Sequence, residues 1–352
     1  MSRFFSEKFD SLMPYTPGEQ PKDKKYIKLN TNESPFPPSP ETLAAAEAEL
    51  KRLQLYPDPD CSELGRAYAD LIGVRAEQVM ITNGSDEVLN LAFLAYADEE
   101  APLIMPDITY GFYTSVAEYN RVSYEEIPLK DDFTIDINDY VAAHKTIVIP
   151  NPNAPTGIAL ELEDIEKILA SNPDNMVIID EAYVDFGAES AVSLIDKYEN
   201  LLVSQTFSKS RSMAGARLGV AIANENVIQD LNTLRYACNP YNVNRVTAAL
   251  GVAAIKTNSY YENNCRTIAE NREYTADRLK EMDFQVIPSK SNFLLAKSDR
   301  ISGEELYRRL KDEKGILIRH FNKERIKEYN RITIGTREDM DAFLKAVEEV
   351  LV

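Results

Sequence analysis

The sequence predicts an α/β protein whose large domain contains a mostly parallel sheet sandwiched by helices, followed by a smaller α+β domain. Three observations support this prediction. First, 352 residues suggest two domains, since a domain usually spans about 100–200 residues. Second, 44% of the residues are apolar, which is enough to build a large core. Third, short apolar runs alternate with helical patterns, as in proteins built from strand–helix–strand units.

The N-terminal segment is expected to be an extended arm, assigned to residues 1–32. Residues 1–40 contain seven prolines, and this density excludes long helices. Regular structure is therefore expected only after the arm, and the large domain is assigned to residues 33–240.

Buried strands are expected where runs of Val, Ile and Leu show little polar alternation, because strands covered on both faces need apolar residues throughout. Five such runs occupy residues 102–105, 146–149, 176–179, 201–207 and 218–223. Helical patterns between them are found at residues 111–119 and 164–169. This alternation favours a mostly parallel sheet, because parallel strands need crossover connections.

The smaller domain is assigned to residues 241–352. A proline and three asparagines within residues 239–244 mark the expected boundary, and a long helix is expected from residue 245 to about residue 282. In the remainder, strands are expected at residues 285–287, 293–296, 316–319 and 331–334. One helix is expected between the second and third of these strands, at residues 303–311, and another after the last strand, at residues 339–350.

The composition excludes several classes of function. Lys and Arg number 39 against 57 Asp and Glu, a formal charge of −18, so neither nucleic acid nor an anionic membrane is an expected partner. Three widely spaced cysteines predict neither disulfides nor a Cys-x-x-Cys metal site, and together with the absence of a long apolar run they favour a cytoplasmic location. The only histidines are His144 and His320, so no zinc site with several histidine ligands, and no other metal, is expected.

A lysine just after a buried strand is the first candidate for chemistry. Lys209 follows the run at 201–207 and opens a loop of small residues that contains two glycines. A lysine held there can have its pKa lowered enough to attack a carbonyl as the free amine, as Schiff-base chemistry requires. The alternative is an exposed loop lysine that pairs with a phosphate or a carboxylate.

A carboxylate follows another buried strand. Asp180 comes directly after the run at 176–179, at the sheet edge where open α/β folds bind ligands. A carboxylate there suits pyridoxal phosphate, because it keeps the ring nitrogen protonated and lets the ring accept electrons. Lys209 lies 29 residues later, about one strand–helix–strand unit, so both side chains can meet at one sheet edge. A Walker-B magnesium site is the alternative, but its partner phosphate loop is missing.

A phosphate site is expected at the start of a helix near residue 85. Gly84 ends a turn, so the free amides of Ser85 and Asp86 occupy the first helical positions. Arg217, eight residues after Lys209, can clamp the same phosphate. The alternatives are an ordinary capped helix and a surface ion pair.

Together these segments resemble the fold-type-I pyridoxal-phosphate aminotransferases over nearly the whole chain. The most specific motifs are Ser-Lys followed by Ala-Gly-x-Arg-x-Gly around Lys209, and Asp-Glu-Ala-Tyr at 180–183. The resemblance implies that Lys209 forms the Schiff base, that Asp180 pairs with the pyridine nitrogen, and that Tyr183 bonds the phenolic oxygen. It also implies that Tyr110 contacts the cofactor ring. The residues implied around the cofactor phosphate are Gly84, Ser85, Asp86, Thr206, Ser208 and Arg217.

The resemblance further implies a homodimer with shared active sites, and substrates that are an amino donor and a 2-oxo acid. Tyr56 matches a tyrosine that reaches the partner's cofactor phosphate, and the arm is expected to pack against the smaller domain and the partner. Arg331 matches the arginine that binds the α-carboxylate of glutamate and 2-oxoglutarate. Tyr15 and Arg319 are expected to hold the phosphate of the substrate. Asn292 and Tyr241 are expected in the wall of the substrate pocket.

Within the family, the arm sequences at 13–18 and 30–35 and the strand at 316–319 are most similar to the enzymes that act on histidinol phosphate. The expected reaction is amino transfer between L-histidinol phosphate and 2-oxoglutarate in histidine biosynthesis, giving imidazole acetol phosphate and L-glutamate. The alternatives are an aromatic amino-acid aminotransferase, a threonine-phosphate decarboxylase, and a binding protein that has lost its activity.

One loop departs from the family pattern. In most relatives an asparagine directly before Pro-Thr-Gly donates to the phenolic oxygen of the cofactor, whereas here Ala154 occupies that position. Alanine has no side-chain donor, so the neighbouring Asn153 is expected to turn inward and replace it. A water molecule, or Tyr183 alone, is the alternative.

Overall fold

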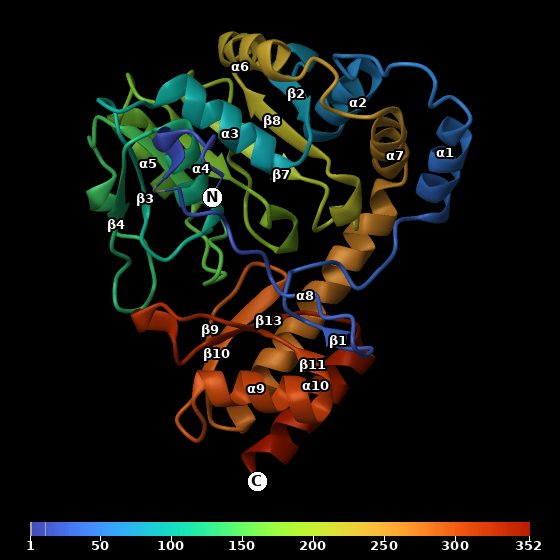
Figure 1. Cartoon of the computed structure of the whole chain (residues 1–352), viewed down its shortest axis with the longest axis vertical. Coiled ribbons are helices and arrows are strands. Elements are labelled where there is room, and N and C mark those ends of the chain that lie inside the picture. The colour runs from blue at the N-terminus through green and yellow to red at the C-terminus, as the bar shows by residue number, and fades with distance from the viewer. Residues whose placement is uncertain (1, 11) are drawn as a thin grey trace.

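The computed structural model describes residues 2–10 and 12–352, which form a seven-stranded sheet covered by helices and a smaller four-stranded antiparallel sheet with its own helices (Figure 1). A two-stranded pairing joins the N-terminal arm to the smaller unit. The predicted fold class, a mostly parallel sheet with helices followed by a smaller α+β unit, is confirmed.

The large sheet is parallel from β7 to β4, and only β8 runs against its neighbours. In spatial order its strands are β2 (Val79–Thr82), β8 (Gly219–Ala223), β7 (Leu201–Thr206), β6 (Val177–Asp180), β5 (Thr146–Pro150), β3 (Leu103–Pro106) and β4 (Tyr124–Ile127). The loop between β7 and β8 contains no crossover helix, so β8 returns antiparallel to β7. The five predicted strands are present; β2 and the polar edge strand β4 were not predicted.

Alternate residues of the central strands point to opposite faces of the sheet, and each face has its own core. Ile147 and Ile149 pack on one face, whereas Val148 between them packs on the other. Helices α2 (Ser62–Ile72), α5 (Leu162–Ser171) and α7 (Arg245–Lys256) cover the first face, and α3 (Ser85–Tyr96), α4 (Phe112–Asn120) and α6 (Glu225–Cys238) cover the second. Helix α1 (Pro40–Leu50) packs on α7 at the periphery.

The smaller unit is built around an antiparallel sheet in the order β12 (Arg319–His320), β13 (Asn330–Thr333), β10 (Phe293–Ser298) and β9 (Phe284–Ile287). Its helices are α8 (Asn258–Glu281), α9 (Gly303–Lys314) and α10 (Arg337–Leu351). The strand expected at 316–319 is divided at Ile318, because β11 (Ile316–Leu317) pairs instead with β1 (Ile27–Lys28) of the arm.

The long helix expected from residue 245 to about 282 is broken, and the change of core falls inside its second part. Thr257 leaves the helical conformation between α7 and α8. Val252 and Tyr261 still pack in the core of the large sheet, whereas Cys265 and Ile268 pack in that of the smaller unit. The boundary predicted near residue 240 therefore precedes the change of core, because the loop at 239–244 only redirects the chain along the large sheet.

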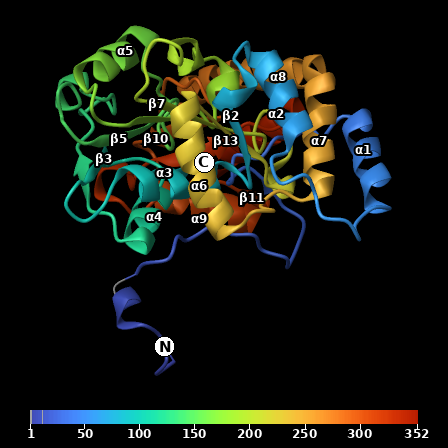
Figure 2. The same cartoon turned by 90° about the horizontal axis from the view of Figure 1, so that it is seen from above.

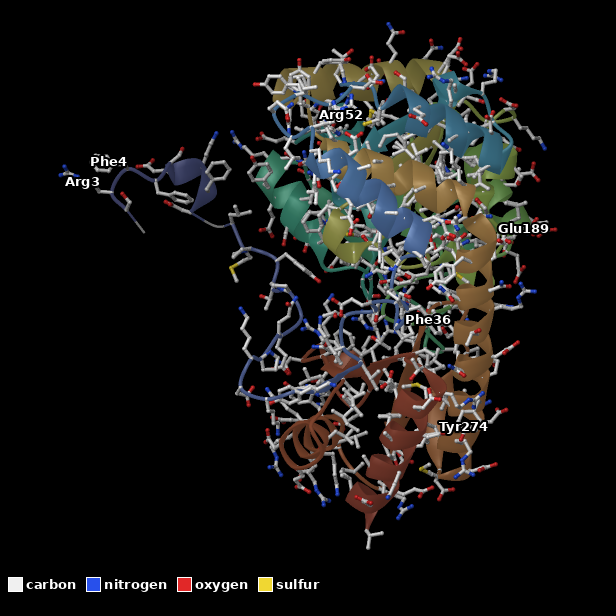
Figure 3. The ribbon with its side chains drawn as sticks, turned by 90° about the vertical axis from the view of Figure 1, so that its right-hand side faces the viewer. Arg3, Phe4, Phe36, Arg52, Glu189 and Tyr274 are labelled. Atoms are coloured by element: carbon white, nitrogen blue, oxygen red, sulfur yellow. The ribbon has the colours of Figure 1, made fainter. Side chains whose placement is uncertain are left out.

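The start of the arm projects away from the body, as Figure 2 shows for the N-terminal end and Figure 3 for Arg3 and Phe4. Further along, the arm returns to the molecule, where β1 pairs with β11 and Leu29 is buried. Within the described residues, no helix combines the length and the apolar character that crossing a membrane requires.

Candidate active site

The topology brings the predicted residues to one edge of the large sheet. Asp180 is the last residue of β6, and Lys209 lies three residues beyond the end of β7. Strands β6 and β7 are parallel neighbours, with Asp180 opposite Ser204, so both side chains lie where the strands end. Strand β2 also ends at this edge and leads into α3.

A cavity of about 420 Å³ opens between this edge, the arm and the smaller unit. It brings together most of the residues predicted from the sequence. These are Tyr15, Ser85, Asp86, Tyr110, Asp180, Tyr183, Thr206, Ser208, Lys209, Arg217, Arg319 and Arg331. Gly84 precedes the first of the helical residues and is the N-cap of α3.

Lys209 is half-buried on a loop that closes on itself. The buried Phe207 accepts a backbone hydrogen bond from Met213 and donates one to Leu218, which fixes the loop on both sides of the lysine. The Lys209 Nζ donates to the Thr31 carbonyl at 3.4 Å and lies 5.8 Å from the centre of the Tyr183 ring. The amine is thus held at the cavity wall without a carboxylate partner among the described residues.

One carboxylate oxygen of Asp180 has no hydrogen-bond partner among the described residues. Its side chain is 3% exposed, and Oδ2 accepts a hydrogen bond from the Tyr113 hydroxyl at 2.8 Å. Oδ1 is buried and has no partner among the described residues. Burial raises the pKa of Asp180 to about 6, although the bond from Tyr113 opposes this shift. A buried acceptor without a donor is costly, so Oδ1 suits a ligand that brings an N–H group.

The start of α3 and the loop after β7 form an anion site. Gly84 has a φ of 79°, and no side chain caps the helix, so the first amides of α3 are free to bind a ligand. A Cβ at Gly219 would lie 2.4 Å from the Ser85 nitrogen, so only glycine lets β8 approach this turn. Arg217 pairs with Asp86 at 2.7 Å, and Thr206 donates to Ser208 at 3.0 Å. Amides, hydroxyls and a guanidinium therefore converge, as a phosphate requires.

Arg331 lies on the side of the cavity formed by the smaller unit. Its Nη2 donates to the Asn30 carbonyl at 3.0 Å, and its buried Nε has no partner among the described residues. The guanidinium lies over the rings of Phe293 and Phe321, and burial lowers its pKa. A half-buried guanidinium with a free donor suits a carboxylate, which can accept two parallel bonds.

Arg319 and Tyr15 lie at the outer part of the cavity. Arg319 is 5.8 Å from the centre of the Phe321 ring, and Tyr15, which is 40% exposed, lies edge-on to Tyr110. Five cationic side chains among the described residues line the cavity, against three acidic ones: Lys209, Arg217, Arg319, Lys323 and Arg331, against Glu33, Asp86 and Asp180. In a chain of charge −18 this local excess of positive charge favours anionic ligands.

The structure contradicts the expectation for Asn153. Its side-chain Nδ2 donates to the Ile108 carbonyl at 2.9 Å, and its Oδ1 accepts from Thr109. Asn153 does not line the cavity, whereas Ala154 does. The inward turn is prevented because the amide already satisfies a buried carbonyl, which would otherwise be left unpaired.

Two predicted substrate residues, Asn292 and Tyr241, lie outside the cavity of their own chain. Asn292 is fully buried behind the cavity wall, where its Nδ2 donates to the Asn32 carbonyl at 3.0 Å. Tyr241 lies at the surface and stacks on Tyr56 with ring centres 4.5 Å apart. Neither Tyr241 nor Tyr56 lines the cavity of its own chain, and Tyr56 is 77% exposed.

Sequence reasoning missed several residues of the site. Tyr113, which donates to Asp180, lies in the first turn of α4, and nothing in the sequence pattern distinguishes it from an ordinary core tyrosine. Thr31 acts through its carbonyl, which any residue could supply, so its identity carried no signal. Asn32 and Lys323 reach the cavity from the arm and from the smaller unit, and only the tertiary fold brings them there.

Comparison with known proteins identifies a family. The model of the family "Aminotransferase class I and II" matches residues 24–347. The histidinol-phosphate aminotransferase of Brachyspira hyodysenteriae is 50% identical, with 100% of this chain and 99% of the relative covered. That of Clostridium botulinum is 44% identical over the same shares. Among solved structures, the histidinol-phosphate aminotransferase of Sinorhizobium meliloti in complex with pyridoxal-5'-phosphate has a TM-score of 0.91 at 22% identity, covering 100% of this chain and 98% of that one.

The raised pKa of Asp180 predicts a pH dependence of stability in the cofactor-free protein. The folded protein binds this proton more tightly than the unfolded chain does, so the contribution of Asp180 to stability decreases as the pH rises from about 4 to about 6. Relative to Asp180→Asn, the wild type should lose about 2–3 kcal/mol of unfolding free energy over this range. Urea unfolding at several pH values measures both proteins, and parallel curves would contradict the assignment.

Proposed function

The chain belongs to the class I and II aminotransferase family, and we propose that it transfers the amino group of L-histidinol phosphate to 2-oxoglutarate, giving imidazole acetol phosphate and L-glutamate. This transamination is a step of histidine biosynthesis. Enzymes of this family use pyridoxal phosphate, so the chain is a pyridoxal-phosphate-dependent aminotransferase.

The observation that carries the cofactor assignment is the unpartnered Oδ1 of Asp180 at the cavity edge. When bound, pyridoxal phosphate supplies a ring that withdraws electrons from the carbon bearing the amino group. Asp180 would hold the proton on the ring nitrogen, and its shortage of partners makes it available for this bond. The amides of Ser85 and Asp86, with Thr206, Ser208 and Arg217, would hold the phosphate. Tyr110 would contact the ring, and Tyr183 would donate to the phenolic oxygen.

Lys209 would hold the cofactor covalently and, once released by the amino donor, move the proton at the reacting carbon. Its position supports both roles, because the closed loop after β7 keeps Nζ at the cavity wall. Arg331 would bind the carboxylate of glutamate and 2-oxoglutarate. Arg319 and Tyr15 would hold the phosphate of the other substrate at the outer part of the cavity.

A homodimer with shared active sites is the proposed assembly. The backbone of Tyr56 is fixed by a hydrogen bond from Arg245 to its carbonyl at 2.8 Å, yet the side chain is 77% exposed. A rigidly held, exposed aromatic ring is typical of an interface anchor. Exposed leucines lie close by in the sequence: Leu43, Leu50, Leu53 and Leu55.

We also propose a cytoplasmic location. The described structure leaves all three cysteines unpaired, namely Cys61, Cys238 and Cys265. Unpaired cysteines, two of them buried, are usual in a reducing compartment.

Replacing the lysine tests the covalent role. Lys209→Ala should lower transamination at least about a thousandfold, because both the covalent link and the proton carrier are lost. The variant should also lack the visible absorption of the lysine-bound cofactor while its circular dichroism remains native. Lys167→Ala, which removes an exposed lysine on α5, is the control and should behave as wild type. Turnover of Lys209→Ala comparable to wild type would refute the role.

Replacing Arg319 tests the substrate. Arg319→Ala should cost about 2–5 kcal/mol in kcat/KM for L-histidinol phosphate, because a phosphate loses its cationic partner. An unphosphorylated aromatic donor such as L-phenylalanine should be affected little. Arg325→Ala is the control, since Arg325 pairs with Asp107 outside the cavity. Equal losses on both donors would favour an aromatic amino-acid aminotransferase.

Sedimentation tests the assembly. The protein should sediment at about 79 kDa, twice the chain mass of 39.7 kDa. Tyr56→Ala should weaken cofactor retention, because the tyrosine contacts the phosphate bound by the partner. Tyr236→Ala, at another exposed tyrosine, should retain the cofactor as wild type does. A fully active monomer would contradict the shared site.

A further inference from the structure

We propose that Asn32 is a positioning residue that orients the Tyr183 hydroxyl toward the cofactor, in a site where the 151–157 loop has no side-chain donor at Ala154. The inference rests on the proposed function, because the hydroxyl acts on the phenolic oxygen only if pyridoxal phosphate binds at this site. Asn32 belongs to the arm, far in sequence from both Ala154 and Tyr183.

The 151–157 loop itself supplies no side-chain amide to the cavity. Ala154 lines the cavity and has no polar side-chain atom. Asn153 is bonded to the Ile108 carbonyl, and Asn151 is bonded to the backbone of Leu160 through both ends of its amide. The only polar side chain that both lines the cavity and contacts the Tyr183 hydroxyl, among the described residues, is Asn32.

The orientation of the Asn32 amide is determined by Thr333. The Thr333 hydroxyl accepts from the Asn32 backbone N–H at 2.9 Å and donates its single proton to Asn32 Oδ1 at 3.1 Å. With Oδ1 facing Thr333, Nδ2 faces Tyr183 and donates to its hydroxyl oxygen at 2.9 Å. Asn32 is 1% exposed, so water does not compete for these bonds.

This arrangement determines where the Tyr183 proton points. Because the hydroxyl oxygen accepts from Asn32, its own proton is available for another acceptor. Within the described residues the hydroxyl has no acceptor, and Tyr183 lines the cavity. The Tyr183 ring is held edge-on against Phe293, with ring centres 5.1 Å apart. The bond from Asn32 therefore polarises a hydroxyl whose proton is directed to the ligand.

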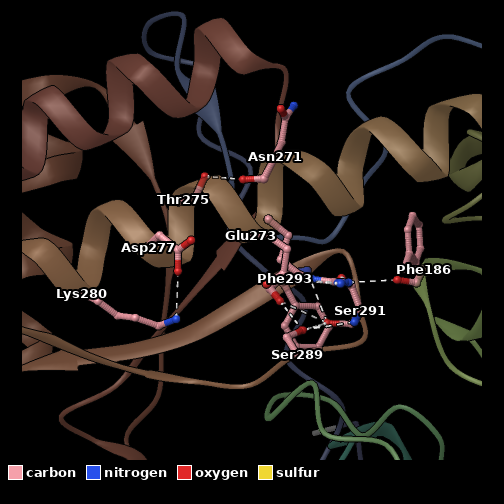
Figure 4. A network of polar contacts seen from close by, with 10 residues as sticks. Phe186, Asn271, Glu273, Thr275, Asp277, Lys280, Ser289, Ser291 and Phe293 are labelled. Atoms are coloured by element: carbon pink, nitrogen blue, oxygen red, sulfur yellow. Dashed lines mark hydrogen bonds and ion pairs between the residues drawn. The ribbon is translucent and has the colours of Figure 1, made fainter.

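Asn32 is fixed on its other side as well. Its φ of 55° lies in the left-handed region, which asparagine tolerates better than most residues. Its carbonyl accepts from Asn292 at 3.0 Å. The loop that carries Asn292 is in turn fixed at Ser291, whose position is labelled in Figure 4. Its carbonyl accepts from Arg272 of α8 at 2.8 Å. The amide thus has a single position relative to Tyr183.

The consequence is measurable on the bound cofactor without turnover. A donor to the negatively charged phenolic oxygen reduces the pull of that oxygen on the proton of the lysine-bound cofactor. Losing or weakening the donor therefore raises the pH midpoint of the visible absorption change. A typical hydrogen bond contributes about 0.5–1.5 kcal/mol, so the midpoint should rise by about 0.4–1 pH unit.

The test compares absorption titrations of the holoenzyme. Asn32→Gly removes the amide while keeping a residue suited to the left-handed backbone, and it should raise the midpoint by this amount. Thr333→Val keeps the volume but frees the amide orientation, and it should raise the midpoint less. Adding Ala154→Asn to Asn32→Gly should return the midpoint toward the wild-type value. Asn330→Ala, which removes another buried amide on β13, should leave the midpoint unchanged.

Tyr183→Phe separates failure of this inference from failure of the proposed function. If Tyr183→Phe raises the midpoint but Asn32→Gly and Thr333→Val do not, Asn32 does not position the hydroxyl and the inference is wrong. If Tyr183→Phe has no effect, or the wild type shows no visible band, the cofactor site itself is wrongly assigned and the inference falls with it. If the double variant with Asn32→Gly and Ala154→Asn keeps the midpoint of Asn32→Gly alone, an asparagine at position 154 does not replace the donor, and that part of the inference is wrong.

Discussion

The buried carboxylate of Asp180 is the constraint on which the site depends. A carboxylate taken out of water needs donors for both oxygens, yet only Tyr113 bonds one of them among the described residues. The fold keeps this costly group at the end of β6, where the neighbouring parallel strand leads to Lys209. Under the proposed function, a cationic ring nitrogen would satisfy the free oxygen, so binding of the cofactor would remove a cost that folding alone leaves in place.

The same principle applies to the opposite charge around the cavity. Arg331 is half-buried against aromatic rings and has a free donor at Nε, and the first amides of α3 have no capping side chain. A ligand carboxylate would satisfy the free donor of Arg331, and a ligand phosphate would satisfy the free amides at the start of α3. The unpaired groups therefore indicate ligands that carry a carboxylate and a phosphate, in a chain that is otherwise strongly acidic.

Several parts of this arrangement could be predicted from the sequence, because they depend on local pattern. Asp180 comes directly after an apolar run and Lys209 two residues after the next one, and the topology of parallel strands then brings them together. The edge strand β4 contains Glu125 and Glu126, so it lacks the apolar signal by which the central strands were recognised. The strand predicted at 316–319 is divided at Ile318 because its two halves pair with different strands, β1 of the arm and β13, and a continuous apolar pattern does not reveal this.

Side-chain orientation could not be predicted, because it depends on competition for hydrogen bonds between distant segments. Asn153 is beside the expected donor position, yet the Ile108 carbonyl, 45 residues away, takes its amide. Asn292 lies next to the cavity wall, as predicted, but its side chain donates to the backbone carbonyl of Asn32 and does not line the cavity. These side-chain orientations depend on which buried carbonyls would otherwise lack a hydrogen-bond donor. A single sequence does not show which carbonyls these are.

Lys209 is the residue proposed to hold the cofactor at this sheet edge. Borohydride reduction makes the link between a lysine and pyridoxal phosphate permanent, and peptide mass spectrometry then locates it. The reduced holoenzyme should carry one phosphopyridoxyl group per chain, on the peptide that contains Lys209. Modification of Lys323, the other lysine that lines the cavity, or no modification at all, would contradict the claim.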